Sequence, residues 1–201
     1  MQKKSYFTIY RIVFIALMAA VIYVLTLFRF PFLGSKLHFA NAACLLSGLL
    51  FGPVGGGLAA GLGSGLFDLL GGGYGAVEAL ITTVSKFLMA AVCALIAGTR
   101  RDGSHLPADA GVGFAAQYRA LWKSAPRIVI GCVVGALSYV ALYMLKTMIK
   151  GFLYTPDAVW TAMASKLPAS LINAAFAMLV APVLYAAILP VLQKAGLMKK
   201  L

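Results

Sequence analysis

Charged residues are scarce in this sequence, and acidic residues are the scarcest. Only 11% of the 201 residues are charged, with 5 aspartates and glutamates against 17 lysines and arginines, whereas 62% are hydrophobic. Soluble domains carry about 25% charged residues, so this composition excludes water as the main solvent. The net charge of +12 does not indicate nucleic-acid binding, because the basic residues lie mostly at the ends of apolar runs and form no continuous stripe.

Residues that build catalytic and metal-binding motifs are also missing. The glycine-rich run over 52–65 lacks the Gly-Lys-Ser/Thr ending of a phosphate loop, so we expect no ATP hydrolysis by this chain. Ser64 lies in that run, but the two histidines, His38 and His105, are expected at the membrane surfaces and cannot serve as its base. The three cysteines lie in apolar runs without the spacing of a metal or redox motif. We therefore predict no enzyme activity, no cofactor and no metal site.

Long apolar runs are abundant, and glycine and alanine recur within them. A transmembrane helix needs about 20 mostly apolar residues, and small residues let such helices approach closely in lipid. Proline and glycine within 51–55 would turn one long helix into a hairpin. We predict an all-α integral membrane protein, a single domain over 1–201 that forms a six-transmembrane-helix bundle with spans at about 7–28, 39–53, 54–70, 77–98, 126–149 and 166–192.

The distribution of lysine and arginine predicts the orientation of the bundle. If the N-terminus lies inside, eleven of the 17 basic residues fall in inner regions and Lys86 falls within a span. The outer regions hold the other five, which are Arg29, Lys36, Lys146, Lys150 and Lys166. Both termini are therefore predicted to be cytoplasmic. Residues 99–125 become a cytoplasmic loop, with an amphipathic stretch around 114–122 on the inner membrane interface.

The segment 30–38 is too apolar for an ordinary solvent loop, yet its proline and glycine prevent it from continuing the first helix. We expect it to fold back over the outer mouth of the bundle as a lid. The candidate lid residues are Phe32, Gly34, Lys36 and His38.

The fourth span carries the most informative polar residues. Glu78, Thr82 and Lys86 are spaced four apart and share one helix face. A lysine near the centre of a span costs about 2.5–3.5 kcal/mol on insertion scales, so it needs a partner or a watery cavity. Glu78 and Lys86 are about 12 Å apart along the axis, too far for a direct pair. One interpretation is that these residues bind a ligand. The alternative is that Lys86 forms an ion pair with Asp68, and that the negative charge of Glu78 is stabilised at the positive N-terminus of its helix.

Other polar and aromatic residues gather near the outer ends of the spans. Ser170 and Asn173 follow Pro168 on the sixth span, and a buried asparagine offers both a donor and an acceptor to a heterocycle or amide. Phe39 and Tyr74 lie at the same outer level, either in an interfacial belt or as stacking surfaces for a flat ligand.

The first span carries Ala16 and Ala20 as a small-x-x-x-small pair. Such a pair indicates either packing within the bundle or an exposed face that docks another membrane protein.

These features together resemble one known family. The alanine pair, the lid, the run from Lys36 to Asn41, the run 50–68 and the threonine-rich fourth helix with Lys86 are similar to the S components of energy-coupling factor (ECF) vitamin transporters. The likeness is to the broad type that includes riboflavin and hydroxymethylpyrimidine proteins. It covers nearly the whole chain, is most specific over 36–98, and adds Asn41 to the candidate substrate-binding residues.

The resemblance implies a high-affinity, multi-pass binding subunit in a bacterial cell membrane. Such a subunit captures a vitamin or vitamin precursor at the outer face and topples within the lipid bilayer to release it inside. Its partners are a transmembrane coupling protein and two cytoplasmic ATPase subunits, and Ala16 and Ala20 match the alanine motif that contacts the coupling protein.

Departures from the family restrict the expected cargo. Nickel and cobalt members use an N-terminal Met-His site, whereas this chain begins with Met1 and Gln2. Thiamin members rely on several outer tryptophans, and only Trp160 is expected at that level here. The sequence does not identify the vitamin, and a stand-alone secondary transporter of a small organic solute is the alternative, although we find no internal repeat typical of that class.

Overall fold

The structure, a computed structural model, describes residues 7–32, 35–99 and 114–197. Five helices in these ranges are long and apolar enough to cross a membrane, as expected for an all-α membrane protein. The helices are α1 (Ile9–Leu27), α2 (Ala40–Leu66), α3 (Ala76–Ala97), α4 (Phe114–Tyr154) and α5 (Val159–Lys194); a π-helical turn (Phe67–Gly71) follows α2, and a 3-10 turn (Pro156–Ala158) precedes α5.

Helix α2 is bent back on itself at Gly52. This residue has φ 75° and ψ −176°, a conformation that glycine adopts at little cost, and Pro53 follows it. The Ser47 hydroxyl donates to the carbonyl of Gly56 at 2.9 Å, although a straight helix would place these residues more than 10 Å apart. The two predicted spans 39–53 and 54–70 are thus the arms of α2. The predicted count of six spans is not confirmed, since the described residues form five spanning helices.

Small residues hold α2 and α3 in close contact. A Cβ atom added at Gly48 would lie 2.3 Å from the carbonyl oxygen of Ala90, and one added at Gly61 would lie 2.7 Å from that of Thr83. Side chains larger than hydrogen would push the backbones apart, so glycine sets the helix separation here. The fully buried core, which includes Leu45 and Met89, lies beside these contacts.

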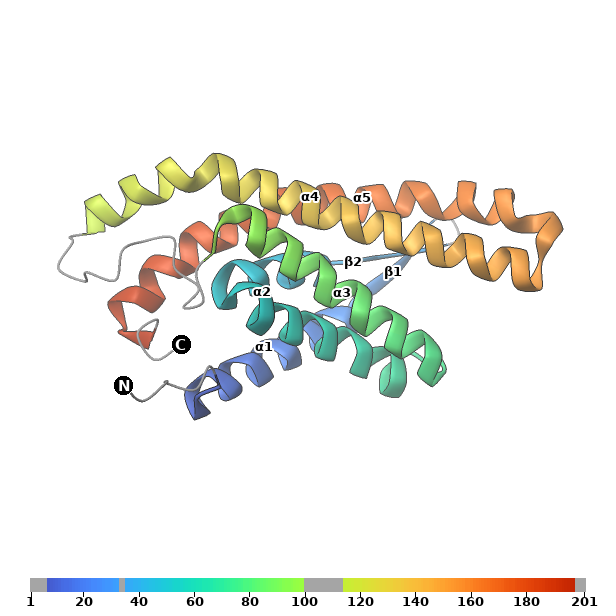
Figure 1. The fold of residues 1–201 in the computed structure, drawn as a ribbon, viewed down its shortest axis with the longest axis horizontal. Coiled ribbons are helices and arrows are strands. Elements are labelled where there is room, and N and C mark those ends of the chain that lie inside the picture. Colours follow the sequence, from blue (N-terminus) through green and yellow to red (C-terminus); the bar gives the residue numbers. More distant parts are fainter. Residues whose placement is uncertain (1–6, 33–34, 100–113, 198–201) are drawn as a thin grey trace.

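The other helices surround α2. Helix α1 packs against α2, α3 packs against α4, and α4 and α5 run side by side along the bundle (Figure 1). The start of α1 and the end of α5 lie at the same end, which we call the closed end; α4 joins α5 at the opposite end, which we call the cavity end. The cytoplasmic placement of both termini stays a prediction.

Two short strands connect α1 to α2. Strands β1 (Arg29–Phe32) and β2 (Ser35–His38) pair antiparallel, with Arg29 opposite His38, and β2 packs against α5. The predicted lid segment is therefore a β-hairpin; Gly34 lies outside the described residues.

The predicted cytoplasmic loop is described only in part. Residues 100–113 lie outside the described ranges, and α4 begins at Phe114. The stretch 114–122 is helical, but it continues directly into α4 and is not a separate interfacial helix.

Candidate functional site

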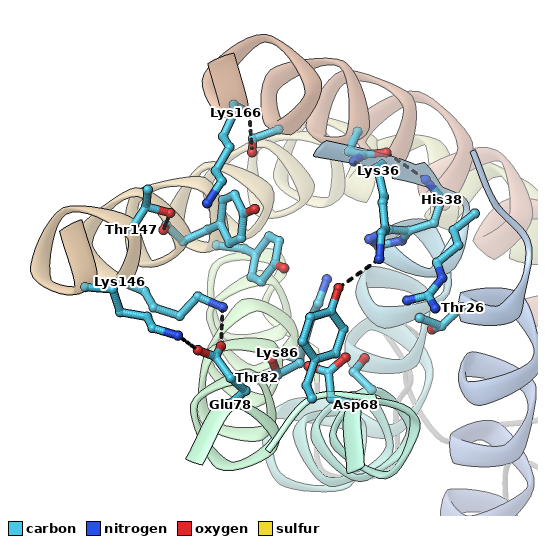
Figure 2. Close-up of a pocket in the computed structure, with 18 of the residues that line it drawn as sticks. Thr26, Lys36, His38, Asp68, Glu78, Thr82, Lys86, Lys146, Thr147 and Lys166 are labelled. Atoms are coloured by element: carbon cyan, nitrogen blue, oxygen red, sulfur yellow. Dashed lines mark hydrogen bonds and ion pairs between the residues drawn. The ribbon is translucent and has the colours of Figure 1, made fainter. Parts of the chain in front are cut away.

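A cavity of about 570 Å³ lies at the cavity end of the bundle (Figure 2). All five helices and the hairpin contribute to its walls, and many of the lining side chains are polar, in contrast to the apolar core. The lining residues that bear on its chemistry are Arg29, Lys36, His38, Asn41, Asp68, Tyr74, Glu78, Thr82, Lys86, Tyr139, Tyr143, Lys146, Lys150, Lys166, Ser170 and Asn173.

Lys86 lies at the inner limit of this cavity and is only 2% exposed. Its ammonium group donates to Oδ1 of Asn41 on the first arm of α2, and it lies 3.6 Å from the ring centroid of Tyr139 on α4. An amide oxygen and an aromatic face partly replace the water that the charge has lost. Within the described residues, Lys86 forms no ion pair with Asp68.

Glu78 is held by two lysines from α4. Lys146 donates to one carboxylate oxygen at 3.0 Å and Lys150 donates to the other. Lys146 and Lys150 are one helical turn apart, so both reach the same carboxylate on α3. Glu78 therefore links α3 to α4 at the edge of the cavity, as an internal ion pair.

Asn173 binds the backbone of the hairpin. Its Nδ2 donates to the carbonyl of Lys36 at 2.8 Å, and its Oδ1 accepts from the amide of His38 at 3.0 Å. Both ends of the amide are thus used on β2. The sequence suggested this amide as a ligand-binding group; in the structure it joins the hairpin to α5 and also lines the cavity.

The hairpin is also attached on its other side. The Lys36 ammonium donates to the hydroxyl of Tyr74 at 2.9 Å, which connects β2 to the segment before α3. Burial, together with the positive charges of Lys86 and Arg29, lowers the pKa of His38 to about 3. The imidazole is therefore neutral near pH 7.

The remaining predicted site residues occupy different surroundings. Thr82 and Asp68 line the cavity, and so does Ser170, whose hydroxyl donates to the carbonyl of Lys166 one turn earlier. Phe39 does not line it; its ring packs 5.0 Å from that of Phe176 and is 43% exposed. Phe32 belongs to β1.

Sequence reasoning did not assign the α4 residues and the outer lysines to the site. Tyr139 and Tyr143 stack with ring centroids 6.2 Å apart in the cavity wall. Lys146, Lys150 and Lys166 were used only as topology signals. A pattern in the sequence could have indicated one polar helix face here. Tyr139, Tyr143, Lys146 and Lys150 follow one another at spacings of about one helical turn.

The alanine pair of α1 faces away from the bundle. Ala16 and Ala20 are exposed, whereas Ile15, Ala19 and Ile22 form the buried face against α2. Packing among the described residues therefore does not use the pair.

Comparisons with known proteins agree with this architecture. A family model described as "ECF-type riboflavin transporter, S component" matches residues 6–189. A solved structure described as "Structure and mechanism of the S component of a bacterial ECF transporter" is similar with a TM-score of 0.51 and 20% identity, over 90% of this chain and 96% of that chain. At that identity the likeness shows a shared fold. No curated protein matches the sequence.

Proposed function

This chain belongs to the family of ECF-type riboflavin transporter S components, and we propose that it is the high-affinity substrate-binding subunit of an ECF importer for a water-soluble vitamin or vitamin precursor. The family is one of transporter components and not of enzymes. The proposal places the chain in a bacterial cell membrane, with the cavity end facing outward and both termini inside.

The cavity is the observation that carries this proposal. Its volume of about 570 Å³ lies within the range of about 300–1,000 Å³ that is typical of small-molecule sites. Buried Lys86 and Asn41, the tyrosines of α4 and the carboxylate of Asp68 offer donors, acceptors and ring faces to a partly polar ligand. The hairpin lies over this site and is held by Asn173 and Tyr74, so it suits the role of a lid.

The proposed importer takes its energy from other subunits. The glycine-rich run has no phosphate-loop ending, so in an ATP-driven importer the hydrolysis would be carried out by partner subunits. We propose that two cytoplasmic ATPases drive a transmembrane coupling protein, and that this protein docks on Ala16 and Ala20. The exposed face of α1 supports this docking, because small residues permit close helix contacts in lipid.

Reconstitution in liposomes tests the proposal. The full chain with its coupling protein and ATPases should accumulate its vitamin only when ATP is present on the ATPase side. A stand-alone secondary transporter would instead move the solute without the partner subunits, driven by an ion gradient. That result would reject the S-component role.

Substitutions on α1 test the docking face. Ala16→Trp and Ala20→Trp should abolish uptake and leave ligand binding by the isolated chain unchanged, because neither residue lines the cavity. Val183→Trp, at an exposed position of α5, serves as the control and should leave both unchanged. Loss of ligand binding in the alanine variants would show that the pair supports the fold instead.

A further inference from the structure

His38 brings a buried polar atom without a protein partner to the cavity. Its side chain lines the cavity from strand β2 of the hairpin (Figure 2). The ring atom Nδ1 is buried, and within the described residues it has no hydrogen-bond partner. The large majority of buried side-chain polar atoms in proteins have a partner, and an atom without one costs free energy. The contacts of the fold therefore leave this nitrogen to be satisfied from within the cavity.

The hairpin holds His38 in place through its backbone. The amide of His38 donates to Oδ1 of Asn173 on α5 at 3.0 Å, and the residue lies opposite Arg29 in the strand pairing. These contacts fix the start of the side chain without using the ring. The imidazole is thus presented to the cavity from a defined position.

Acceptors that a ligand could use are scarce in this cavity. The acceptor groups of Asn41, Glu78, Asn173 and Tyr74 each accept a hydrogen bond from a protein donor. The lining is also rich in lysine, whose ammonium group only donates. A ligand with N–H or O–H groups therefore finds few acceptors here, and Nδ1 of His38 is one that no described residue occupies.

The charge state of the ring decides what its nitrogens can offer. The imidazole is neutral near pH 7 because its pKa is about 3, so one nitrogen carries a proton and the other carries a lone pair. Burial and the positive charges of Lys86 and Arg29 keep the second proton off the ring. Positive charge nearby also stabilises a lone pair at the buried nitrogen.

We propose that Nδ1 of His38 accepts a hydrogen bond from an N–H or O–H group of the bound vitamin, and that the proton of the ring lies on Nε2. This role rests on the function proposed above and specifies one group that the vitamin must carry. A compound without a donor at this point would leave the nitrogen buried and unpaired, so the site discriminates against it. The bond needs no charge on the ligand, and a neutral vitamin can form it.

The same hydrogen bond would connect the ligand to the lid. His38 belongs to β2, and both ends of the Asn173 amide join the backbone of β2 to α5. A ligand that bonds to the ring therefore contacts the hairpin at the point where it is attached to the bundle. Recognition of the ligand and closure of the lid would then share one contact.

Substitutions at His38 separate the nitrogen from the shape of the ring. His38→Phe keeps a ring and removes both nitrogens. His38→Asn places an amide oxygen at about the position of Nδ1, whereas the amide of His38→Gln lies one carbon further from the backbone. Phe30→Leu is the control, because it changes an exposed ring of the same hairpin that does not line the cavity.

The probe is the vitamin that copurifies with the full chain, identified by mass spectrometry after denaturation. Isothermal titration of the dialysed protein then measures the affinity of each variant for this compound. Thermal unfolding of the ligand-free proteins verifies that each variant is folded. His38→Phe should unfold at no lower temperature than the wild type, because no protein bond to Nδ1 is lost.

We expect His38→Phe and His38→Gln to bind the vitamin about tenfold or more weakly than the wild type and Phe30→Leu, as for the loss of one hydrogen bond. His38→Asn should bind with an affinity close to that of the wild type. Equal affinity of the wild type and His38→Phe would overturn the inference. Equal losses in His38→Phe and His38→Asn would also overturn it, because the shape of the ring would then matter and not its nitrogen. Both outcomes leave the proposed function intact.

Analogues of the vitamin that are methylated at one N–H or O–H group at a time identify the donor. One of them should bind the wild type about tenfold more weakly than the parent compound does, and should bind His38→Phe about as well as the parent compound does. If every analogue loses the same factor in both proteins, Nδ1 accepts from no ligand donor and the inference is wrong. Recovery of no vitamin from the purified chain would overturn the proposed function as well, which distinguishes that failure from the others.

Discussion

The two ends of the bundle are built from the same helices, but the residues that lie between neighbouring helices are small at the closed end and bulky at the cavity end. At the closed end, Cβ atoms added at Gly131 and Gly135 of α4 would lie 2.6 Å and 2.8 Å from the backbone oxygens of Cys93 and Met89 on α3. One and two turns later, Tyr139 and Tyr143 occupy this side of α4 and line the cavity. The cavity thus exists because bulky polar residues replace glycine along one helix face.

This difference also divides the energetics of the molecule. Close packing at the closed end maximises van der Waals contact, which is the main source of helix association in lipid. The cavity end gives up such contact and keeps charges that need partners or water. Stability should therefore depend on the closed end, and ligand recognition on the cavity end.

The largest effect is expected from Gly131→Ala at the closed end. The new methyl group would lie 2.6 Å from the carbonyl oxygen of Cys93 and 3.0 Å from the amide of Ala97, both backbone atoms that cannot move independently. Thermal or denaturant unfolding in detergent should show a loss of about 1–3 kcal/mol or more. Gly75→Ala makes the same change where no atom lies within 4 Å, and an equal loss there would contradict the proposed division.

The next effect is expected from Lys86→Ala at the boundary between the two ends. Removal of the charge leaves Oδ1 of Asn41 and the face of Tyr139 without their partner, so the inner wall of the site changes. Ligand binding should weaken by about 100-fold, as expected for loss of a buried charged hydrogen bond. Isothermal titration with the identified vitamin measures this, and Lys123→Ala, on the exposed surface of α4, is the control. Unchanged affinity would remove Lys86 from the site.

A smaller effect is expected from Asn173→Leu, which acts on the lid. The substitution removes two hydrogen bonds to β2, worth about 0.5–1.5 kcal/mol each. The bound ligand should dissociate several times faster, while the unfolding midpoint changes less than in Gly131→Ala. Stopped-flow release of the ligand measures the rate. A rate equal to that of the wild type would show that the lid needs no attachment to α5.

The smallest effect is expected from pH and acts through His38. Its pKa is about 3 in the folded protein and about 6.5 when unfolded, so the unfolded chain binds a proton first. This contribution to stability is complete well above pH 6.5 and falls as the pH decreases toward 3, by about 1.4 kcal/mol at pH 5.5. On acidification the unfolding midpoint of the wild type should therefore fall relative to that of His38→Gln. A constant difference between them would exclude this titration.

The apolar helices could be predicted closely because hydropathy is a local property. The expected spans 77–98 and 7–28 differ from α3 and α1 by at most two residues at each end. The join near Gly52 was also predictable, since proline and glycine mark a break within the run itself. Whether its two arms count as separate spans depends on their path through the membrane, which the sequence leaves open.

The candidate site was only partly predictable, because its residues are distant in sequence. Lys86, Thr82 and Glu78 could be assigned to one helix face from their spacing. The partners of Lys86 and Glu78 could not, since Asn41 lies 45 residues from Lys86 and Lys150 lies 72 residues from Glu78. The sequence predicted a ligand-binding role for Asn173, which stays a prediction, and only the position of β2 shows that its amide binds the hairpin backbone.

The order of residues alone is enough to predict a lipid environment for this protein, the absence of a phosphate-loop motif and the presence of costly polar residues within an apolar chain. These follow from composition and short-range spacing, which act on each segment separately. The packing of the helices is needed to show which polar groups meet, which charges have no counter-ion among the described residues and where a cavity remains. Those outcomes depend on how closely neighbouring helices approach, and that distance is set by pairs of residues far apart in the chain.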